Sequence, residues 1–142
     1  MVFIDASAIV AILNEEDLAD ELEARLAQHQ GAFHVSPLAR FEATVALARA
    51  RRDAQKSRAE SLRLAELAVD DFIAALNARS IDITPEIGRG ALDAGKIFGK
   101  FVGHAADLNF GDCFAYACAK ALRAPLLFKG ADFSLTDVND GL

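Results

Sequence analysis

Short apolar runs that alternate with longer amphipathic segments constrain the fold of this chain most strongly. The runs MVFID, AFHVSP, SIDITP and PLLF have the length and the Val, Ile, Phe and Leu content of buried strands. A fifth run, SLTDV, is a further strand candidate near the C-terminus. Strands that alternate with helices favour a parallel sheet covered on both faces. The sequence therefore predicts a three-layer α/β/α domain with a central, mainly parallel sheet of four to five strands.

The segments between these runs carry helical signals. Ser36 before Pro37, and Thr84 before Pro85, each combine a good N-cap with a residue suited to the first helical turn. Together with the apolar periodicity, these signals predict helices over residues 6–13, from 15 to about 31, after Pro37, over 54–79, after Pro85 and from about 112. The segment GHAADLNFGD is predicted to be a loop before the last helix.

Length and composition favour one soluble domain. The chain has 142 residues, of which 53% are hydrophobic, so we expect a single domain over residues 1–142. No uninterrupted apolar run reaches the ~18 residues of a membrane span, and no Lys or Arg precedes Arg25, unlike in a secretory signal peptide. Cys113 and Cys118 lie five residues apart on different faces of one predicted helix, which makes them poor disulfide partners. These features favour a cytoplasmic protein.

Charge is distributed unevenly along the chain. A formal net charge of −6 argues at first against nucleic acid, which attracts proteins through Lys and Arg. Seven acids precede Arg25, however, whereas the stretch from Arg40 to Arg63 is rich in bases and holds few acids. A basic face can therefore coexist with an acidic one, although solvated helix surfaces carry such charges too.

Four acids are expected at one edge of the sheet. Asp5 ends the first predicted strand, and Glu42 lies in the early turns of the helix after the second strand. Asp112 begins the last helix, and Asp132 follows the PLLF strand. Since parallel sheets bind ligands beyond the carboxyl ends of their strands, we expect these carboxylates to converge there. Taken singly, each acid has a simpler explanation, because Asp and Glu near helix N-termini act as caps.

A divalent cation would resolve the repulsion between converging carboxylates. Acids that share a crevice raise one another's pKa unless a cation lies between them. Oxygen ligands without a His or Cys cluster favour Mg²⁺ or Mn²⁺ over zinc. Such ions activate water for phosphodiester hydrolysis, and a reaction that bypasses the 2′-hydroxyl leaves 5′-phosphate and 3′-hydroxyl ends. The three histidines, His29, His34 and His104, show no linking pattern and are predicted to be structural or surface residues.

The segments FIDASAIVAIL, SPLARFEATVALARAR and LNFGDCFAYACAKALRAPLLFKGADFSLTDV together resemble PIN-domain ribonucleases, specifically the VapC toxins of VapBC toxin–antitoxin modules. The resemblance implies that the catalytic, metal-binding acids are Asp5, Glu42, Asp112 and Asp132. Ser7 matches the small hydroxyl residue beside the first acid, where it either supports the metal site or caps the first helix. Many relatives place the fourth acid two residues earlier, where this chain has Gly130. Asp132 would then act from a slightly different position.

The same resemblance implies an Mg²⁺- or Mn²⁺-dependent endoribonuclease toxin that cuts structured RNA, such as a tRNA or rRNA loop, and so inhibits translation. It also implies a homodimer, neutralised in a hetero-oligomer by a VapB-like antitoxin that docks in an apolar groove among the early helices. DNA contacts would then belong to the antitoxin alone, and no membrane partner is expected. Arg40, Arg49 and Lys129, near the rim of the acidic site, are candidate RNA contacts.

The main alternative is a non-catalytic PIN-fold scaffold that binds RNA or a protein partner. The departure at Gly130 favours this alternative, whereas the intact Asp5, Glu42 and Asp112 weigh against it. A phosphatase with an aspartyl nucleophile is disfavoured, because such enzymes need a second Asp two residues after the first, where this chain has Ser7.

Overall fold

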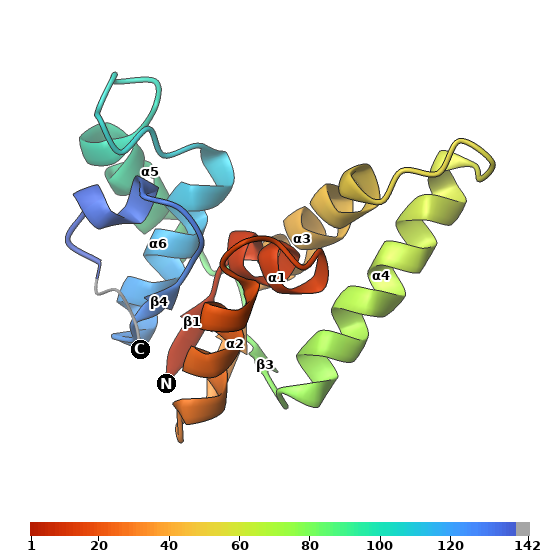
Figure 1. Cartoon of the computed structure of the whole chain (residues 1–142). Helices are drawn as coiled ribbons and strands as arrows, with labels where there is room; N and C mark the ends of the chain where they lie inside the picture. The colour runs from red at the N-terminus through yellow and green to blue at the C-terminus, as the bar shows by residue number, and fades with distance from the viewer. Residues whose placement is uncertain (139–142) are drawn as a thin grey trace.

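A parallel four-stranded sheet forms the centre of the molecule. The structure, a computed structural model, describes residues 1–138 (Figure 1). The strand order is β3-β2-β1-β4, and every pairing is parallel. The strands are β1 (Val2–Ile4), β2 (Phe33–Val35), β3 (Arg79–Ser80) and β4 (Leu126–Leu127). The chain moves outward from β1 through β2 to β3 and then returns to the other side of β1. In sheets of this kind, that reversal opens a crevice at the carboxyl end of the central strand.

Within residues 1–138, six α-helices and one 3₁₀ helix surround the sheet. They are α1 (Ala6–Leu13), α2 (Ala19–Gln28), α3 (Pro37–Ala50), α4 (Arg58–Ala75), α5 (Pro85–Phe98), α6 (Phe110–Leu122) and η1 (Asp132–Leu135). Both predicted Pro-containing N-termini are confirmed: Ser36 Oγ accepts from the Ala39 amide at 3.0 Å, and Thr84 Oγ1 accepts from the Ile87 amide at 3.3 Å. None of the helices among residues 1–138 has the length and apolarity needed to cross a membrane.

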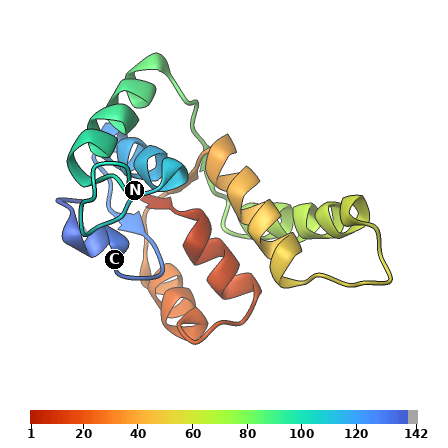
Figure 2. The same ribbon diagram turned by 90° about the horizontal axis from the view of Figure 1, so that it is seen from above.

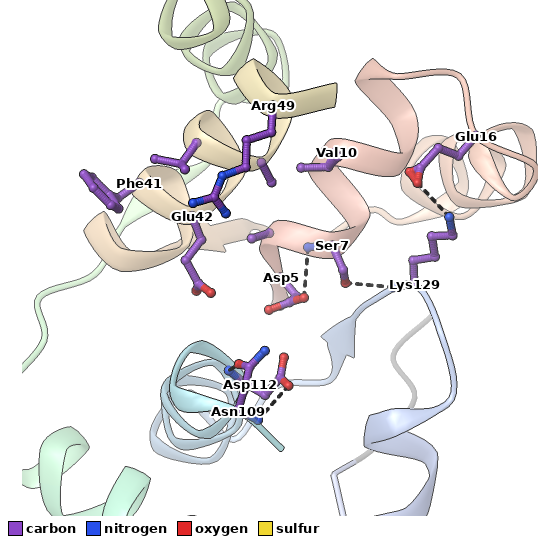
Figure 3. Close-up of a pocket in the computed structure, with 13 residues that line it drawn as sticks. Asp5, Ser7, Val10, Glu16, Phe41, Glu42, Arg49, Asn109, Asp112 and Lys129 are labelled. Atoms are coloured by element: carbon purple, nitrogen blue, oxygen red, sulfur yellow. Dashed lines mark hydrogen bonds and ion pairs between the residues drawn. The ribbon is translucent and has the colours of Figure 1, made fainter. Parts of the chain in front are cut away.

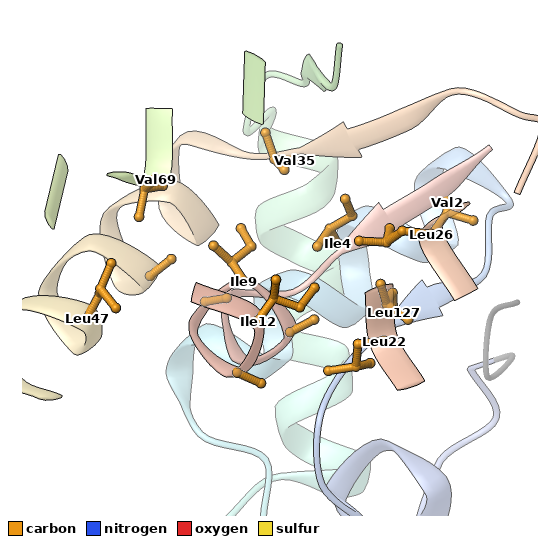
Figure 4. Packing of buried hydrophobic residues seen from close by; sticks show 14 of the residues in the cluster. Val2, Ile4, Ile9, Ile12, Leu22, Leu26, Val35, Leu47, Val69 and Leu127 are labelled. Atoms are coloured by element: carbon orange, nitrogen blue, oxygen red, sulfur yellow. The ribbon is translucent and has the colours of Figure 1, made fainter. Parts of the chain in front are cut away.

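The strand side chains alternate between two apolar cores, one on each face of the sheet. Val2 and Ile4 pack in one core with residues of α1, α2, α3 and α4, as Figure 4 shows. Phe3, between them, points to the opposite core, where it packs with residues of α5 and α6. This alternation follows from the two-residue period of a strand. The predicted three-layer α/β/α architecture with a parallel sheet is thereby confirmed.

Helices α3 and α4 project from the body of the molecule as an antiparallel pair (Figures 1 and 2). The Arg40 guanidinium on α3 donates to both carboxylate oxygens of Asp70 on α4, at 2.6 and 2.8 Å. It also donates to Glu66 at 2.9 Å. Buried Leu47 and Val69 belong to the same apolar core beneath this ionic contact. The two helices are therefore joined by a shared apolar core and, at the surface, by the bidentate ion pair between Arg40 and Asp70.

Four predicted elements differ from the structure. The predicted fifth strand at residues 134–138 does not form; there the chain follows η1, and Phe133 packs on Phe128 with ring centroids 5.0 Å apart. The strand expected from Ser80 pairs only over Arg79–Ser80. Helices predicted over 15–31 and 54–79 are shorter, since Glu15 and Asn77 take positive φ values of 50° and 49° that interrupt helical geometry.

Candidate functional site

Asp5 is the single residue between β1 and α1, at the carboxyl end of β1. Its backbone amide donates to Leu127 O of β4 at 2.9 Å, which fixes the residue between two strands. Its side chain caps α1 by accepting from the Ser7 amide at 2.9 Å. The Ser7 hydroxyl accepts from the Lys129 amide at 3.0 Å and so joins the start of α1 to the segment after β4. Asp5 is only 4% exposed, an unusual position for a carboxylate.

Asp5, Glu42 and Asp112 line one open pocket of about 420 Å³ (Figure 3). The three acids come from different parts of the chain: Asp5 from the end of β1, Glu42 from the second turn of α3, and Asp112 from the first turn of α6. The figure shows their carboxylates directed into the space between α1, α3 and α6. The structure thus brings together three of the four acids predicted from the sequence.

The Glu42 carboxylate lies against Gly111, in the first turn of α6. A Cβ atom built on Gly111 would overlap all three atoms of that carboxyl group. The missing side chain therefore provides the space in which Glu42 approaches Asp112. The partial positive charge at a helix N-terminus favours an acid in this position.

Asp112 is held by a reciprocal cap at the N-terminus of α6. The Asn109 side chain accepts from the Asp112 amide at 2.9 Å, and Asp112 Oδ2 accepts from the Asn109 amide at 3.0 Å. The capping role weighed for Asp112 from sequence is therefore present in the structure. It does not exclude a second role, because a carboxylate has several acceptor positions and this cap uses one of its oxygens.

Burial and mutual repulsion make the three acids unusually weak acids. Burial is the main cause in each case, and it raises the pKa of Asp5 although hydrogen bonds from Ser7 oppose it. The pKa of Glu42 rises to about 7, with the charges of Asp5 and Asp112 adding to the effect of burial. The pKa of Asp112 rises to about 6. The negative charge that a metal-free site retains at neutral pH is therefore unfavourable, and a divalent cation between the acids would relieve the repulsion.

The donor set suits a hard divalent cation. Asp5, Glu42 and Asp112 offer only oxygen atoms, and none of the three histidines lines the pocket. Within residues 1–138, no three His, Cys, Asp or Glu side chains lie close enough together to coordinate one metal ion as they stand. The residues therefore fit Mg²⁺ or Mn²⁺ by chemistry and charge, and binding would require their carboxylates to draw together.

Asp132 stands apart from the other three acids. It begins η1 and does not line the pocket, yet its charge contributes to the raised pKa of both Asp5 and Asp112. Gly130, two residues earlier, has a φ of +103°, a backbone conformation that strongly favours glycine. That turn accounts for a glycine at position 130, and it places Asp132 beyond the turn.

The three candidate RNA contacts differ in their surroundings. Arg49 lines the acidic pocket from α3. Lys129 also lines it, but its ammonium is bound to Glu16 at 2.7 Å. Arg40 does not line the pocket, because its guanidinium is engaged by Asp70 and Glu66. Arg49 is thus the candidate whose charge is best placed for a ligand in the pocket.

Gly111, Asn109 and Glu16 were not singled out by the sequence. Asn109 precedes Asp112 by three residues, a spacing that is a signal for a reciprocal cap. A glycine inside the first turn of a helix signals a close approach by another group, but it does not identify Glu42 as that group. The Glu16 contact with Lys129 joins residues far apart in the chain and left no sequence signal.

Comparison with known proteins places these features in a family. The PIN domain family model matches residues 2–139. A VapC ribonuclease of Rhizobium meliloti is 51% identical over 141 residues, covering 97% of this chain and 99% of that protein. Ribonuclease VapC30 of Mycobacterium tuberculosis is 38% identical over 136 residues, covering 95% and 94% of the two chains. The crystal structure of Mycobacterium tuberculosis VapC20, a sarcin-ricin loop cleaving toxin, has the same fold, with a TM-score of 0.75, 16% identity and 99% and 98% coverage.

Proposed function

This chain belongs to the VapC ribonucleases of the PIN-domain family, and from that premise we propose a metal-dependent endoribonuclease whose site is built on Asp5, Glu42 and Asp112. The family assigns the activity of an endoribonuclease toxin of a toxin–antitoxin system. One observation carries the proposed site: three acids from separate elements line one pocket and have raised pKa values. The dependence on Mg²⁺ or Mn²⁺ follows from the chemistry of this donor set.

Each acid has a distinct role in the proposed site. Asp5 is the fixed ligand, because burial, its amide bond to β4 and the Ser7 contacts hold it in place. Glu42 and Asp112 approach from α3 and α6 on either side of the pocket. When bound, the cation supplies an activated water and neutralises charge on the scissile phosphate. Asp132, outside the pocket, would act through its negative charge.

A homodimer is the assembly that the molecular surface favours. An apolar groove of about 1010 Å³ runs along α5 and the first turn of α6. Leu92, Phe101, Val102 and Phe110 line it, and each is at least half exposed. Exposed apolar surface of this extent marks an interaction site. Asn109 lines both this groove and the acidic pocket, so pairing through it would bring two pockets into one substrate channel.

A VapB-like antitoxin is the proposed regulatory partner, and a structured RNA loop is the proposed substrate. A second, mainly apolar groove lies between α1, α2 and α4, lined by residues that include Leu13, Leu26 and Phe72. Its place among the early helices fits the expected antitoxin groove. A cytoplasmic location is likewise proposed, supported by an RNA substrate and by Cys113 and Cys118, which are buried free thiols.

Cleavage of total cellular RNA tests this function. Purified, antitoxin-free protein is incubated with Mg²⁺, Mn²⁺ or EDTA, beside Asp112→Asn, and fragment ends are mapped by sequencing. We expect discrete cuts with 5′-phosphate ends that require the metal and disappear in the variant. Intact RNA under every metal, from a protein that remains folded, would instead support the non-catalytic scaffold.

A further inference from the structure

A cationic pocket lies beside the acidic one, in the angle between α3 and α4. It has a volume of about 430 Å³, and its polar lining consists of Arg49, Arg52, Arg58 and Ser61. Arg49 is near the end of α3, Arg52 follows it in the connecting loop, and Arg58 opens α4. The pocket therefore occupies the base of the loop that joins the two projecting helices in Figure 2.

The charge of this pocket is poorly compensated. Across residues 1–138, Arg49 and Arg58 make no ion pair or side-chain hydrogen bond. Arg52 donates to two backbone carbonyls, Asp53 O at 2.8 Å and Lys56 O at 3.1 Å. Asp53, the acid beside it, is paired with Lys56. Other bases on α3 and α4 are neutralised instead, such as Arg63 by Glu60.

A buried hydroxyl group in this pocket lacks a partner. Ser61 is 8% exposed, and its Oγ has no hydrogen-bond partner among residues 1–138. It lies one turn into α4, an 18-residue helix capped by Ser57. Buried hydroxyls are almost always satisfied, so an orphan at this position marks a place where a ligand can accept its hydrogen bond. The adjacent helix N-terminus favours an anionic ligand.

The cationic pocket is continuous with the acidic pocket. Val45 and Arg49 line both of them. We propose that the cationic pocket binds a backbone phosphate of the RNA substrate, one that neighbours the phosphate cleaved at the acidic site. This inference rests on the proposed ribonuclease function. In this proposal Arg52, Arg58 and Ser61 position the RNA. The RNA-binding surface then extends from the acidic pocket along α3.

RNA affinity measured without cleavage tests this assignment. Fluorescence anisotropy follows a labelled single-stranded RNA binding to the wild-type protein and to the Arg52→Gln/Arg58→Gln variant, in EDTA, over a range of salt concentrations. Loss of this phosphate contact should weaken binding about tenfold at 0.1 M salt and reduce the magnitude of the salt-dependence slope by about 0.7. The control, Arg123→Gln, removes another exposed arginine that lies outside both pockets and should leave affinity and slope unchanged.

Ser61→Ala separates ligand binding from folding. Removal of an unsatisfied buried hydroxyl should leave the thermal midpoint unchanged or raise it. If the hydroxyl contacts phosphate, the same variant should bind RNA several-fold more weakly. A merely structural Ser61 would give wild-type affinity. Arg58→Gln alone offers the same comparison, because this side chain makes no ion pair or hydrogen bond within residues 1–138.

Three results would overturn the assignment in distinguishable ways. Wild-type affinity and salt slope in the double variant, with normal metal-dependent cleavage, would remove the phosphate subsite and leave the ribonuclease intact. Normal RNA binding with reduced affinity for an acidic peptide would reassign the pocket to a protein partner. If the wild-type protein neither binds nor cuts RNA, the proposed function fails and the subsite fails with it.

Discussion

At the scale of single residues, Gly111 decides how closely Glu42 approaches Asp112. We predict that Gly111→Ala lowers the cleavage rate by about 10- to 100-fold, because the new methyl group displaces the Glu42 carboxylate. Single-turnover cleavage measures the effect. The matched control is Gly88→Ala in α5, where a Cβ meets nothing within 4 Å; because Gly88 lines the apolar groove proposed for the dimer, the mass of this variant is measured beside its activity. It should retain full activity and gain about 0.5–1 kcal/mol of stability. Equal activities of the two variants would argue against the close approach.

Glu42 also makes the stability of the metal-free protein depend on pH. Its pKa is about 7 in the folded chain and near 4.5 in the unfolded chain. Between these values the folded chain holds a proton that the unfolded chain has released, so the free energy of unfolding falls as pH rises from about 4.5 to 7. Stabilisation by the protonated form is complete below that window and lost above it.

Glu42→Gln should therefore stabilise the metal-free protein at pH 8 while abolishing cleavage. We expect a gain of about 1–2 kcal/mol at pH 8, after allowance for partial exposure, and little difference at pH 4.5. Urea denaturation in EDTA at both pH values measures the gain. A variant that is less stable than the wild type at pH 8 would show that Glu42 is not repelled by its neighbours.

The acids could be predicted because carboxyl ends of parallel strands meet at one edge, and Asp5, Glu42 and Asp112 each follow a recognisable strand or helix signal. Their assignment as metal ligands remains a prediction. Asp132 was harder to place, because the Gly130 turn depends on a backbone angle that no periodicity encodes. The role of Arg40 was equally hidden, since its partner Asp70 lies 30 residues away.

At the scale of elements, the Arg40 contact with Asp70 ties α3 to α4. Both side chains are nearly half exposed, so the ion pair should contribute only about 0.5–1 kcal/mol. A double-mutant cycle with Arg40→Gln and Asp70→Asn, read by chemical denaturation, isolates this coupling energy. RNA affinity should change little in Arg40→Gln, because the guanidinium is engaged away from the acidic pocket. A large loss of affinity would restore Arg40 as an RNA contact.

Helix starts that carry a Ser/Thr–Pro signal were predicted best. Ser36 and Thr84 mark the starts of α3 and α5, because each side chain accepts a hydrogen bond from an amide three residues later. The bounds predicted for α2 and α4 were too wide at both ends: α2 begins at Ala19, and α4 begins at Arg58 and ends before Asn77, which takes a positive φ. The predicted fifth strand does not form because its first two residues, Ser134 and Leu135, belong to η1, whose Phe133 packs on Phe128.

At the scale of the whole molecule, the apolar groove along α5 should determine the oligomeric state. We predict that Phe101→Asp converts a dimer to a monomer, because a charge in the middle of an apolar interface is strongly unfavourable. Light scattering after size-exclusion chromatography measures the mass. Leu135→Asp is the control, since Leu135 is 53% exposed outside the groove. A wild-type protein that is monomeric at micromolar concentration would contradict the proposed dimer.

The three-layer architecture could be predicted from the alternation of strands and helices, whereas the oligomeric state could not. A single domain over all 142 residues and a homodimer both remain predictions, because no pattern in one chain identifies the surface that a second copy covers. The net charge of −6 gave no sign of the cationic pocket, because its arginines come together only when α3 and α4 pack against each other.

The most direct test of the central claim is a calorimetric titration of Mn²⁺ into metal-free protein at pH 8. We expect binding to be lost or weakened at least tenfold in Asp5→Asn, Glu42→Gln and Asp112→Asn, and to be weakened less in Asp132→Asn, which changes a residue outside the pocket. Asp93→Asn, which removes an exposed acid paired with Lys96, should bind as the wild type does. Undiminished Mn²⁺ affinity in Asp5→Asn and Asp112→Asn would show that these acids do not form the metal site.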